Sequence, residues 1–589
     1  MNSHKEQRDS LLRICYSKAP SNAALNLAGI ANCLGISAEL IDVSLSANRT
    51  EDLRLSLGGR AAIWDAESLA ALIGPAEWNS VASLLPNISA MLLVLVTAGD
   101  DTQNEFLRVL SDRVIAAAQP AKSPAIVRFP AGSYRLSAEL SGQSFRRAAK
   151  QALSMQVEGL KAETVMDLGE DLPSFLFIQR GAARLFIWST LSVFDMDRPL
   201  GKEIEFEEAT DEYIPAIIFL RAAFGELCWH NPRHDADIVI DDPLLEKRYG
   251  LIDFPELLGL AGELDLHVTV AFIPWNHWRT RQLPLRIFLD HAGSFAICAH
   301  GCDHISREFR TNDYRDLLGR SCLAAERMDR HRERTGMDWD RLMVSPREEY
   351  TIDAVRALAD SGRYLGMVNT GCIPRDLDTR HVRGSDLLWP VHDSFFGFPL
   401  FKRHYWSDIS VFAMGAFLGK PAILVEHHDF FQDHCRSVKE FATKLRGISP
   451  SVRWTNLTGI ASQTHARKRG ATGGWDIRFF ADEFTIHIPD TVPQTLRFQR
   501  RLPADIGVES VTLNGARVSY LRDGNILRFE TELPPGGLAS VRIRRSAVPA
   551  SGVMPGGLIY EARVALRRAL SEFRDNTRRP ARQMAAADA

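Results

Sequence analysis

The stretch Ala236-Asp-Ile-Val-Ile-Asp-Asp-Pro243 indicates both a fold class and a candidate site. Its apolar run is short enough for one buried β-strand, and it ends abruptly in two carboxylates, Asp241 and Asp242. Neighbouring side chains of an extended chain point to opposite sides, so these two carboxylates cannot have the same task. One is expected to hold a metal ion and the other to meet the substrate.

A second stretch, Ser294-Phe-Ala-Ile-Cys-Ala-His-Gly-Cys-Asp-His304, repeats the pattern with imidazoles. His300 and His304 are four residues apart, which places both on one face if a helical turn begins where the strand ends. Together with Asp242 they make a set of one oxygen and two nitrogens with positions open for water, which is typical of a catalytic zinc site. An isolated Asp pair after a strand is more often a helix N-cap, but the downstream His pair favours a site. Cys302, inside the His pair, is expected to pack as a small apolar side chain.

The composition is that of an ordinary globular protein. The 589 residues are 45% hydrophobic and 24% charged, with a formal net charge of −3. This balance argues against non-specific binding to nucleic acid. No stretch of about 18 uncharged apolar residues occurs, so no transmembrane helix is expected. The eight cysteines form no CxxC pair, which suits a reducing compartment and predicts a cytoplasmic protein.

The hydrophobic periodicity predicts four regions. Residues 1–200 form an N-terminal α/β domain of unknown role, Rossmann-like or flavodoxin-like, with a parallel sheet covered on both faces. Its first strand-to-helix junction lacks a glycine-rich phosphate motif, so a structural or regulatory role is favoured. Residues 205–465 form a (β/α) barrel, 470–546 a β-sandwich, and 547–589 a helix followed by a disordered tail.

The expected elements of the first domain alternate between strands and helices. The strands are residues 11–16, 38–43, 61–64, 91–96 and 125–129, the helices are 22–33, 67–73 and 104–114, and 175–188 is a hairpin around a glycine turn. In the third region strands are expected at 475–480, 483–488, 511–513, 518–521 and 541–543, and an amphipathic helix follows at 558–573.

Six strand-like runs in the second region end in polar or aromatic residues. These runs are residues 238–240, 267–272, 295–299, 342–344, 365–368 and 422–425. Reactive residues gathered at the carboxyl ends of strands are what a (β/α) barrel or an open α/β sheet shows at its functional face.

Residues 213–465 resemble the polysaccharide deacetylase family, carbohydrate esterase family 4. The Asp pair after a strand and the His-x-x-x-His stretch carry the resemblance. It implies a distorted (β/α) barrel and a divalent metal ion, expected to be Zn²⁺. It also implies Asp241 as general base and Asp242, His300 and His304 as metal ligands.

The resemblance also implies a general acid, which is a His at the end of a late strand. Leu424-Val-Glu-His-His428 offers two. Strand alternation directs them to opposite sides, so only one enters the pocket; His427 is favoured, and His428 is the alternative.

The third motif departs from the family pattern. The family's Arg precedes a Pro, whereas here the order is Ser345-Pro346-Arg347, so the sequence does not identify the Arg that orients Asp241. Pro346 and Arg347 are nevertheless expected at the substrate. Trp275, Trp278 and Trp406 offer aromatic faces for a sugar ring, although large aromatic side chains more often pack in a core.

The predicted function is a metal-dependent hydrolase that removes N-acetyl groups from a sugar, polysaccharide or glycan precursor. A soluble precursor, or a lipid-linked glycan facing the cytosol, fits the predicted location. Two alternatives remain: a hydrolase of small amides of the ureide type, and a non-catalytic carbohydrate-binding or scaffold protein with a degenerate barrel. The expected partner is a carbohydrate, and no nucleic acid is expected.

Overall fold

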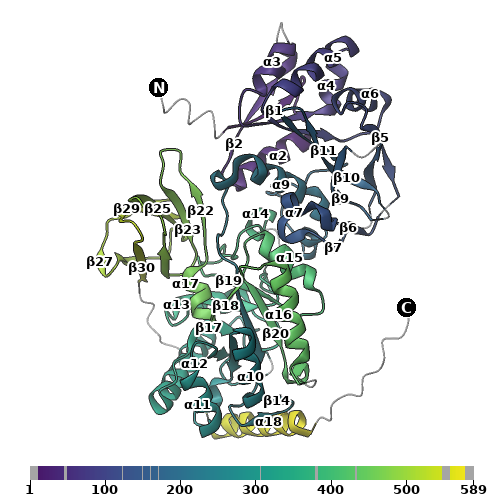
Figure 1. Ribbon diagram of the computed structural model, residues 1–589. Coiled ribbons are helices and arrows are strands. Elements are labelled where there is room, and N and C mark those ends of the chain that lie inside the picture. The colour runs from purple at the N-terminus through teal and green to yellow at the C-terminus, as the bar shows by residue number, and fades with distance from the viewer. Residues whose placement is uncertain are drawn as a thin grey trace. The chain divides into compact units, whose positions relative to one another are not determined.

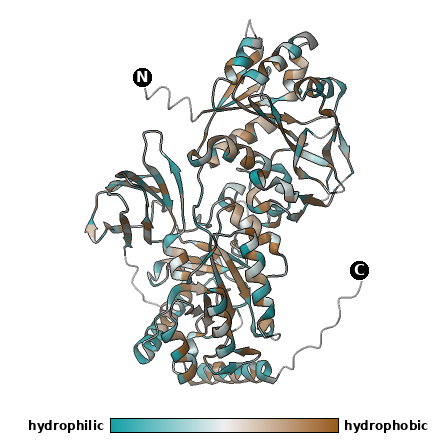
Figure 2. Ribbon diagram, in the orientation of Figure 1, coloured by the Kyte–Doolittle hydropathy of each residue, from teal (hydrophilic) through white to brown (hydrophobic). Residues whose placement is uncertain are grey.

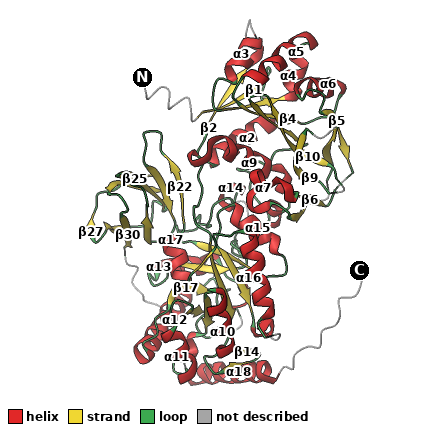
Figure 3. Ribbon diagram, in the orientation of Figure 1, coloured by secondary structure: helices red, strands yellow, loops and turns green. Residues whose placement is uncertain are grey.

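The computed structural model describes residues 11–577 except 46–48, 123, 149, 159–160, 170, 306, 378–381, 432–433 and 547–556. The chain forms two compact units. One consists of residues 1–230, 379–388 and 467–476, and the other of residues 231–378, 389–466 and 477–589. Figure 1 labels their elements, and Figure 3 separates helices from strands.

The first unit is built on a nine-stranded sheet in the order β2-β1-β3-β4-β11-β10-β9-β6-β7. The first five strands in this order, β2, β1, β3, β4 and β11, run parallel to one another. The other four, β10, β9, β6 and β7, pair antiparallel with their neighbours. The bounds are β1 (Leu11–Tyr16), β2 (Ser37–Asp42), β3 (Ala61–Asp65), β4 (Met91–Val96), β6 (Ile126–Arg128), β7 (Ser144–Arg146), β9 (Ala162–Asp167), β10 (Pro173–Arg180) and β11 (Ala183–Ser189). The strands expected at 11–16, 38–43, 61–64 and 91–96 pair in parallel, whereas the one expected at 125–129 is β6 and pairs antiparallel. The hairpin expected at 175–188 is β10–β11, which turns back at Gly181 and starts the antiparallel half.

Helices of this unit begin at side-chain caps. Ser21 accepts a hydrogen bond from the backbone N–H of Ala24, and Asp100 accepts one from that of Gln103. The helix expected at 104–114 is α6, which begins at Asp101 and ends at Leu110. It ends there because Asp112 and Arg113 have positive φ. The others are α2 (Asn22–Cys33), α3 (Arg49–Ser56), α4 (Ala66–Leu72), α5 (Pro75–Leu84), α7 (Tyr134–Ser137), α8 (Ile204–Glu207), α9 (Ile214–Phe224) and α14 (Gly384–Leu387); β5 (Ile115–Ala121) and β8 (Ala152–Val157) pair separately.

The second unit contains a closed barrel of seven parallel strands. They are β12 (Asp235–Asp241), β15 (Val268–Phe272), β16 (Phe295–His300), β17 (Asp340–Val344), β18 (Gly366–Asn369), β19 (Leu400–His404) and β20 (Ala422–Glu426). Each strand pairs with the next in this order, and β12 pairs with both β20 and β15, which closes the ring. The short strand β21 (Arg453–Trp454) adds to β12. In Figure 2 the barrel strands are mostly brown, because nearly all their residues are buried.

Strand β19 was not predicted from the sequence. Leu400-Phe-Lys-Arg-His404 has only two apolar residues before three basic ones, so it reads as a polar loop. In the structure its Arg403 is fully buried. Helices between successive barrel strands are α10 (Phe254–Leu264), α11 (Gln282–Asp290), α12 (Tyr314–Thr335), α13 (Ile352–Asp360) and α15 (Ile409–Phe417), and α16 (Arg436–Ile448) and α17 (Leu457–Gln463) follow β20.

Two antiparallel sheets follow the barrel. Their orders are β22-β23-β25-β29-β28 and β24-β30-β26-β27. Phe484 of one sheet contacts Phe479 and Phe498 of the other, so the sheets share an aromatic core. The bounds are β22 (His465–Arg469), β23 (Trp475–Phe479), β24 (Glu483–His487), β25 (Gln494–Arg501), β26 (Val508–Leu513), β27 (Ala516–Arg517), β28 (Leu521–Asp523), β29 (Ile526–Leu533) and β30 (Leu538–Arg545). The sequence missed β25 and β29, whose buried positions alternate with charged ones.

The last described element is α18 (Leu558–Thr577), four residues longer than expected. The predicted disordered tail lies largely outside the described residues, which end at Thr577. Within the part of the chain that the structure describes, no helix combines the length and the apolar character needed to cross a bilayer.

Truncation of Ile297 tests the packing that carries His300. Ile297 is fully buried in β16, whereas Leu289 in α11 is 43% exposed. Ile297→Ala should lower the free energy of unfolding by about 2–5 kcal/mol, and the isomeric control Leu289→Ala by less than about 1 kcal/mol. Urea denaturation followed by circular dichroism measures both; equal effects would contradict the barrel packing.

Candidate metal centre

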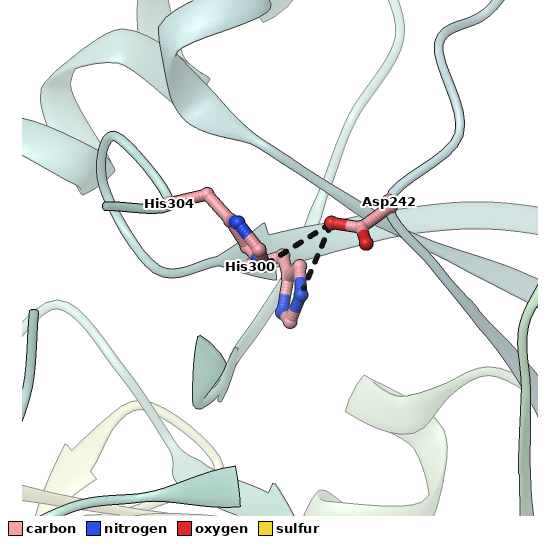
Figure 4. Close-up of side chains that lie close together, drawn as sticks. All are labelled: Asp242, His300 and His304. Carbon is pink, nitrogen blue, oxygen red and sulfur yellow. Dashed lines mark ion pairs between the residues drawn. The ribbon is translucent and has the colours of Figure 1, made fainter. Parts of the chain in front are cut away.

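Three of the predicted site residues converge at the carboxyl ends of β12 and β16. Asp242 Oδ1 lies 3.1 Å from His304 Nε2 and 3.5 Å from His300 Nε2 (Figure 4). One ligand atom from each residue falls within 4.8 Å of the others. Asp242 and the imidazoles are separated by almost 60 residues in the sequence, and the pairing of β12 with β15 and of β15 with β16 brings them together.

The backbone holds two of the three side chains in an uncommon conformation. Asp242 has φ 80° and His304 has φ 52°, in the left-handed region that few non-glycine residues adopt. Such strain persists only where the surrounding structure imposes it, and it gathers at functional sites. The helical turn expected after β16 is absent: residues 301–305 form an irregular loop, and the two imidazoles meet through this loop instead.

Gly301 permits the turn between the two imidazoles. Its φ is 66°, and a Cβ there would collide with the ring of Pro346 and with Glu308 Oε2. Pro346, expected at the substrate, is buried and instead packs against this turn.

Glu308 holds the loop and was missed by sequence reasoning. Its Oε1 accepts the backbone N–H groups of Cys302 and Asp303 at 3.1 and 2.8 Å, and its Oε2 accepts that of His304 at 3.1 Å. Burial, followed by the charge of Asp303, raises the pKa of Glu308 to about 7. Nothing in the local sequence distinguishes this Glu from a solvated one.

The charges of Asp242 and His304 and the hydrogen bond of His300 suit metal binding. His300 Nδ1 lies 3.2 Å from the carbonyl oxygen of Val344, and an N–H donated there leaves the Nε2 lone pair directed at Asp242. Burial lowers the pKa of His304 to about 3 against the opposing charge of Asp242, so this imidazole is neutral near pH 7. Burial raises the pKa of Asp242, but His304 and His300 outweigh it and lower the pKa below its ordinary value.

The donor set fits a divalent cation. Asp242 Oδ1 is buried and accepts no hydrogen bond of good geometry from any described residue, although it faces two imidazoles. A buried carboxylate oxygen without a donor is costly unless a cation or water meets it. One carboxylate and two imidazoles are ligands that zinc uses in catalytic sites.

Asp241, the neighbour of Asp242, faces a different partner. Arg403 of β19 donates from Nη1 and Nη2 to both carboxylate oxygens, at 2.7 and 2.8 Å, and both side chains are buried. Burial would raise the pKa of Asp241, but Arg403, His300 and His427 hold it well below the usual range. The Arg that orients Asp241 is therefore Arg403, which the sequence did not identify because β19 reads as a polar loop.

The two late histidines occupy different surroundings. His427 follows β20 directly and is among the groups that lower the pKa of Asp241. His428 is buried, with Nε2 3.8 Å from Asp575 Oδ1 and its ring against Tyr249. This arrangement favours His427 as the one that meets the site.

The remaining predicted substrate contacts are spread around the strand ends. The Trp275 ring lies under the Arg327 guanidinium, and the Trp275 backbone N–H donates to the carbonyl oxygen of Cys302. Trp278 is 60% exposed. Trp406 packs against Phe430 and under the Lys444 ammonium. Arg347 is exposed, with a left-handed φ of 57°. Their contact with a sugar stays a prediction.

A second group of potential ligands, Cys302, Asp303 and Glu308, lies beside the first. Glu308 is occupied by backbone N–H groups, and Asp303 Oδ1 accepts from Arg327 at 2.5 Å. Burial raises the pKa of the Cys302 thiol far above its ordinary value, so it is not a thiolate ligand. Its expected role as a packed apolar side chain agrees with its full burial.

Arg568 of α18 also reaches the site. Its Nη2 lies 3.2 Å from His304 Nδ1. A guanidinium only donates, so in this hydrogen bond His304 Nδ1 accepts through its lone pair. A neutral imidazole that binds a cation through Nε2 carries its proton on Nδ1, which then cannot accept. This contact and metal binding through His304 Nε2 therefore exclude each other.

No protein-family model and no curated protein matches the sequence. Among solved structures, the chain is similar to Agd3, a carbohydrate deacetylase, at 10% identity, over 91% of this chain and 99% of that chain, with a TM-score of 0.45. It is also similar to a family 4 carbohydrate esterase from Streptomyces lividans (12% identity, 38% and 94% coverage, TM-score 0.25). A mutant of BA3943, a CE4 family pseudoenzyme with restored activity, is similar at 11% identity (39% and 69% coverage, TM-score 0.25). At TM-scores below 0.5 these likenesses carry no inference about activity.

Removal of Arg403 should destabilise the barrel. Arg403→Met leaves the buried Asp241 carboxylate without its partner, so the free energy of unfolding at pH 7 should fall by about 3–5 kcal/mol. Asp241→Asn/Arg403→Met should recover part of this loss. Because the folded-state pKa of Asp241 is depressed, the stabilisation is present above the unfolded pKa of about 4 and is lost as pH falls below it. Urea denaturation at pH 7 and pH 3 measures both effects; a loss that is equal at the two pH values would contradict the assignment.

Removal of Glu308 should loosen the loop that carries both imidazoles. Glu308→Ala deletes the acceptor of three backbone N–H groups, and the affinity for Zn²⁺ should fall about 10- to 100-fold. The control Glu333→Ala changes an exposed Glu of α12. Calorimetric titration with Zn²⁺ measures the affinity; unchanged binding by Glu308→Ala would show that the loop does not position the ligands.

Proposed function

We propose that this chain is a metal-dependent hydrolase that removes N-acetyl groups from a sugar, polysaccharide or glycan precursor. The observation that carries the proposal is the convergence of Asp242, His300 and His304 beside an Asp241 that is ionised and paired with Arg403. This set lies at the carboxyl ends of the strands of a closed parallel barrel, where such barrels place their active sites.

A divalent cation, which we propose to be Zn²⁺, would be held by Asp242, His300 and His304 and would supply Lewis acidity to the amide carbonyl and the attacking water. The chain's own contribution is to hold these ligands ready. Glu308 fixes the loop of His304, and the carbonyl of Val344 fixes the tautomer of His300.

The proton transfers fall to Asp241 and His427. Asp241 accepts a proton from the water molecule as its oxygen attacks the acetyl carbonyl carbon, and Arg403 keeps the carboxylate ionised and oriented. His427 gives a proton to the nitrogen as the C–N bond breaks, so that acetate and a free amino sugar leave. Trp275, Trp278 and Trp406 offer apolar faces to the sugar, and Arg347 a charge, at the edges of the site.

Substitution of the ligands and of the base should separate metal binding from turnover. Asp242→Ala and His304→Ala should lose a stoichiometric metal, whereas Asp241→Asn should retain the metal and lose about 10²–10⁴-fold in rate. His427→Gln should lower the rate similarly, and His428→Gln, the matched control, should not. Metal content by mass spectrometry and acetate release from N-acetylated chito-oligosaccharides measure the two properties.

Other outcomes would favour the alternatives. A metal-free wild-type protein that binds the oligosaccharide would favour a carbohydrate-binding scaffold. A metal-loaded protein that releases no acetate from any sugar but hydrolyses a ureide would favour a small-amide hydrolase. An equal loss of rate in the two histidine variants would contradict the assignment of His427.

A further inference from the structure

The inward face of α18 makes polar contacts with the loops that follow three barrel strands. Glu572 pairs with Arg279 at 2.6 Å and 2.9 Å, after β15. Further hydrogen bonds join the helix to loops after β12 and β16: Asp575 to Tyr249 (2.9 Å), Asn576 to Gly250 (2.9 Å) and Tyr560 to Asp303 (2.5 Å). With Arg568 at His304, these contacts place α18 across the mouth of the barrel that holds the candidate metal centre.

The inward face of α18 is largely polar. Its buried residues are Val564, Arg568 and Asp575, two of which are charged. The helix is therefore held at the mouth mainly by ion pairs and hydrogen bonds, to which the buried Arg568 and Asp575 contribute.

Apart from the buried Val564, the large apolar side chains of α18 are exposed on its outward face. Ile559, Leu566, Leu570 and Phe573 are 88%, 63%, 61% and 70% exposed. Their spacings of seven, four and three residues place them in one stripe along the helix, opposite Arg568. An exposed stripe of this size marks an interaction surface.

The charges beside this stripe are basic. Arg563, Arg567 and Arg574 lie along one flank and, with Leu566 and Leu570, line a shallow open hollow. Of the three acidic residues of α18, Glu572 and Asp575 are turned to the barrel, where they pair with Arg279 and Tyr249, and Glu561 is exposed in the first turn.

We propose that the outward face of α18 binds an anionic lipid surface. A helix with a continuous apolar stripe and an arginine flank lies in the plane of a bilayer interface, with its apolar side chains among the acyl chains and its guanidinium groups at the phosphates. Its 20 residues give it a length of about 30 Å. The absence of an acidic side chain from the outward stripe of α18 favours an anionic surface over a protein of mixed charge.

Vesicle co-sedimentation of the full chain tests the binding step without using activity. Vesicles of phosphatidylcholine and phosphatidylglycerol (3:1) should sediment the protein, and vesicles of phosphatidylcholine alone should do so at least about 10-fold less. Leu566→Glu/Leu570→Glu should lose binding to the anionic vesicles. Leu521→Glu/Leu538→Glu, a matched change of two exposed leucines in β28 and β30, should retain it.

Three outcomes would overturn the proposal. They are equal binding to both vesicle types, undiminished binding by Leu566→Glu/Leu570→Glu, and a wild-type dimer without vesicles that the same variant dissociates. The last would show that a second copy of the chain covers the stripe.

Co-sedimentation requires neither a metal nor turnover, so a failure of the proposed deacetylase activity leaves its result interpretable.

Discussion

The buried ion pair between Asp241 and Arg403 is the interaction on which the rest of the site depends. It joins β12 to β19: Arg403 Nη1 donates to Asp241 Oδ1, and Nη2 donates to Oδ2. Two charges taken out of water are tolerated only when each satisfies the other, so the position of one strand end fixes that of the other. Asp241 is paired with Arg403, whereas Asp242 faces the two imidazoles. The different partners of the two adjacent carboxylates therefore give them different roles.

The loop that follows β16 holds the imidazoles through different contacts. His304 and Asp242 are both in the left-handed backbone region, and Gly301 supplies the tight turn between β16 and His304. Such a loop would relax in isolation, since strained backbone needs surrounding contacts to maintain it. Glu308 provides these contacts by accepting three consecutive N–H groups. The ligands are therefore ordered by the protein itself, which lowers the entropic cost of binding an ion.

The helix α18 has two faces of opposite chemistry. The polar face meets the barrel mouth, and the apolar face is exposed. Most amphipathic helices bury the apolar face in their own domain, because that burial drives their folding. The reversed orientation here is the reason to look for a partner outside the chain.

The sequence by itself determined much of the local structure. Apolar runs marked six of the seven barrel strands, and the residues at their ends singled out Asp242, His300 and His304, which the structure places within 4.8 Å of one another. The sequence also predicted different tasks for Asp241 and Asp242, but Asp242 lies beyond the end of β12 with a left-handed φ, so the turn and not strand alternation separates them. Tertiary structure alone decided the rest. Arg403, Glu308 and Arg568 lie 162, 4 and 264 residues from the site residues they contact, on segments whose own pattern is that of polar loop or solvated helix. A charged side chain acquires its role from the partner that the closed barrel brings to it, and that partner cannot be read from the residues on either side.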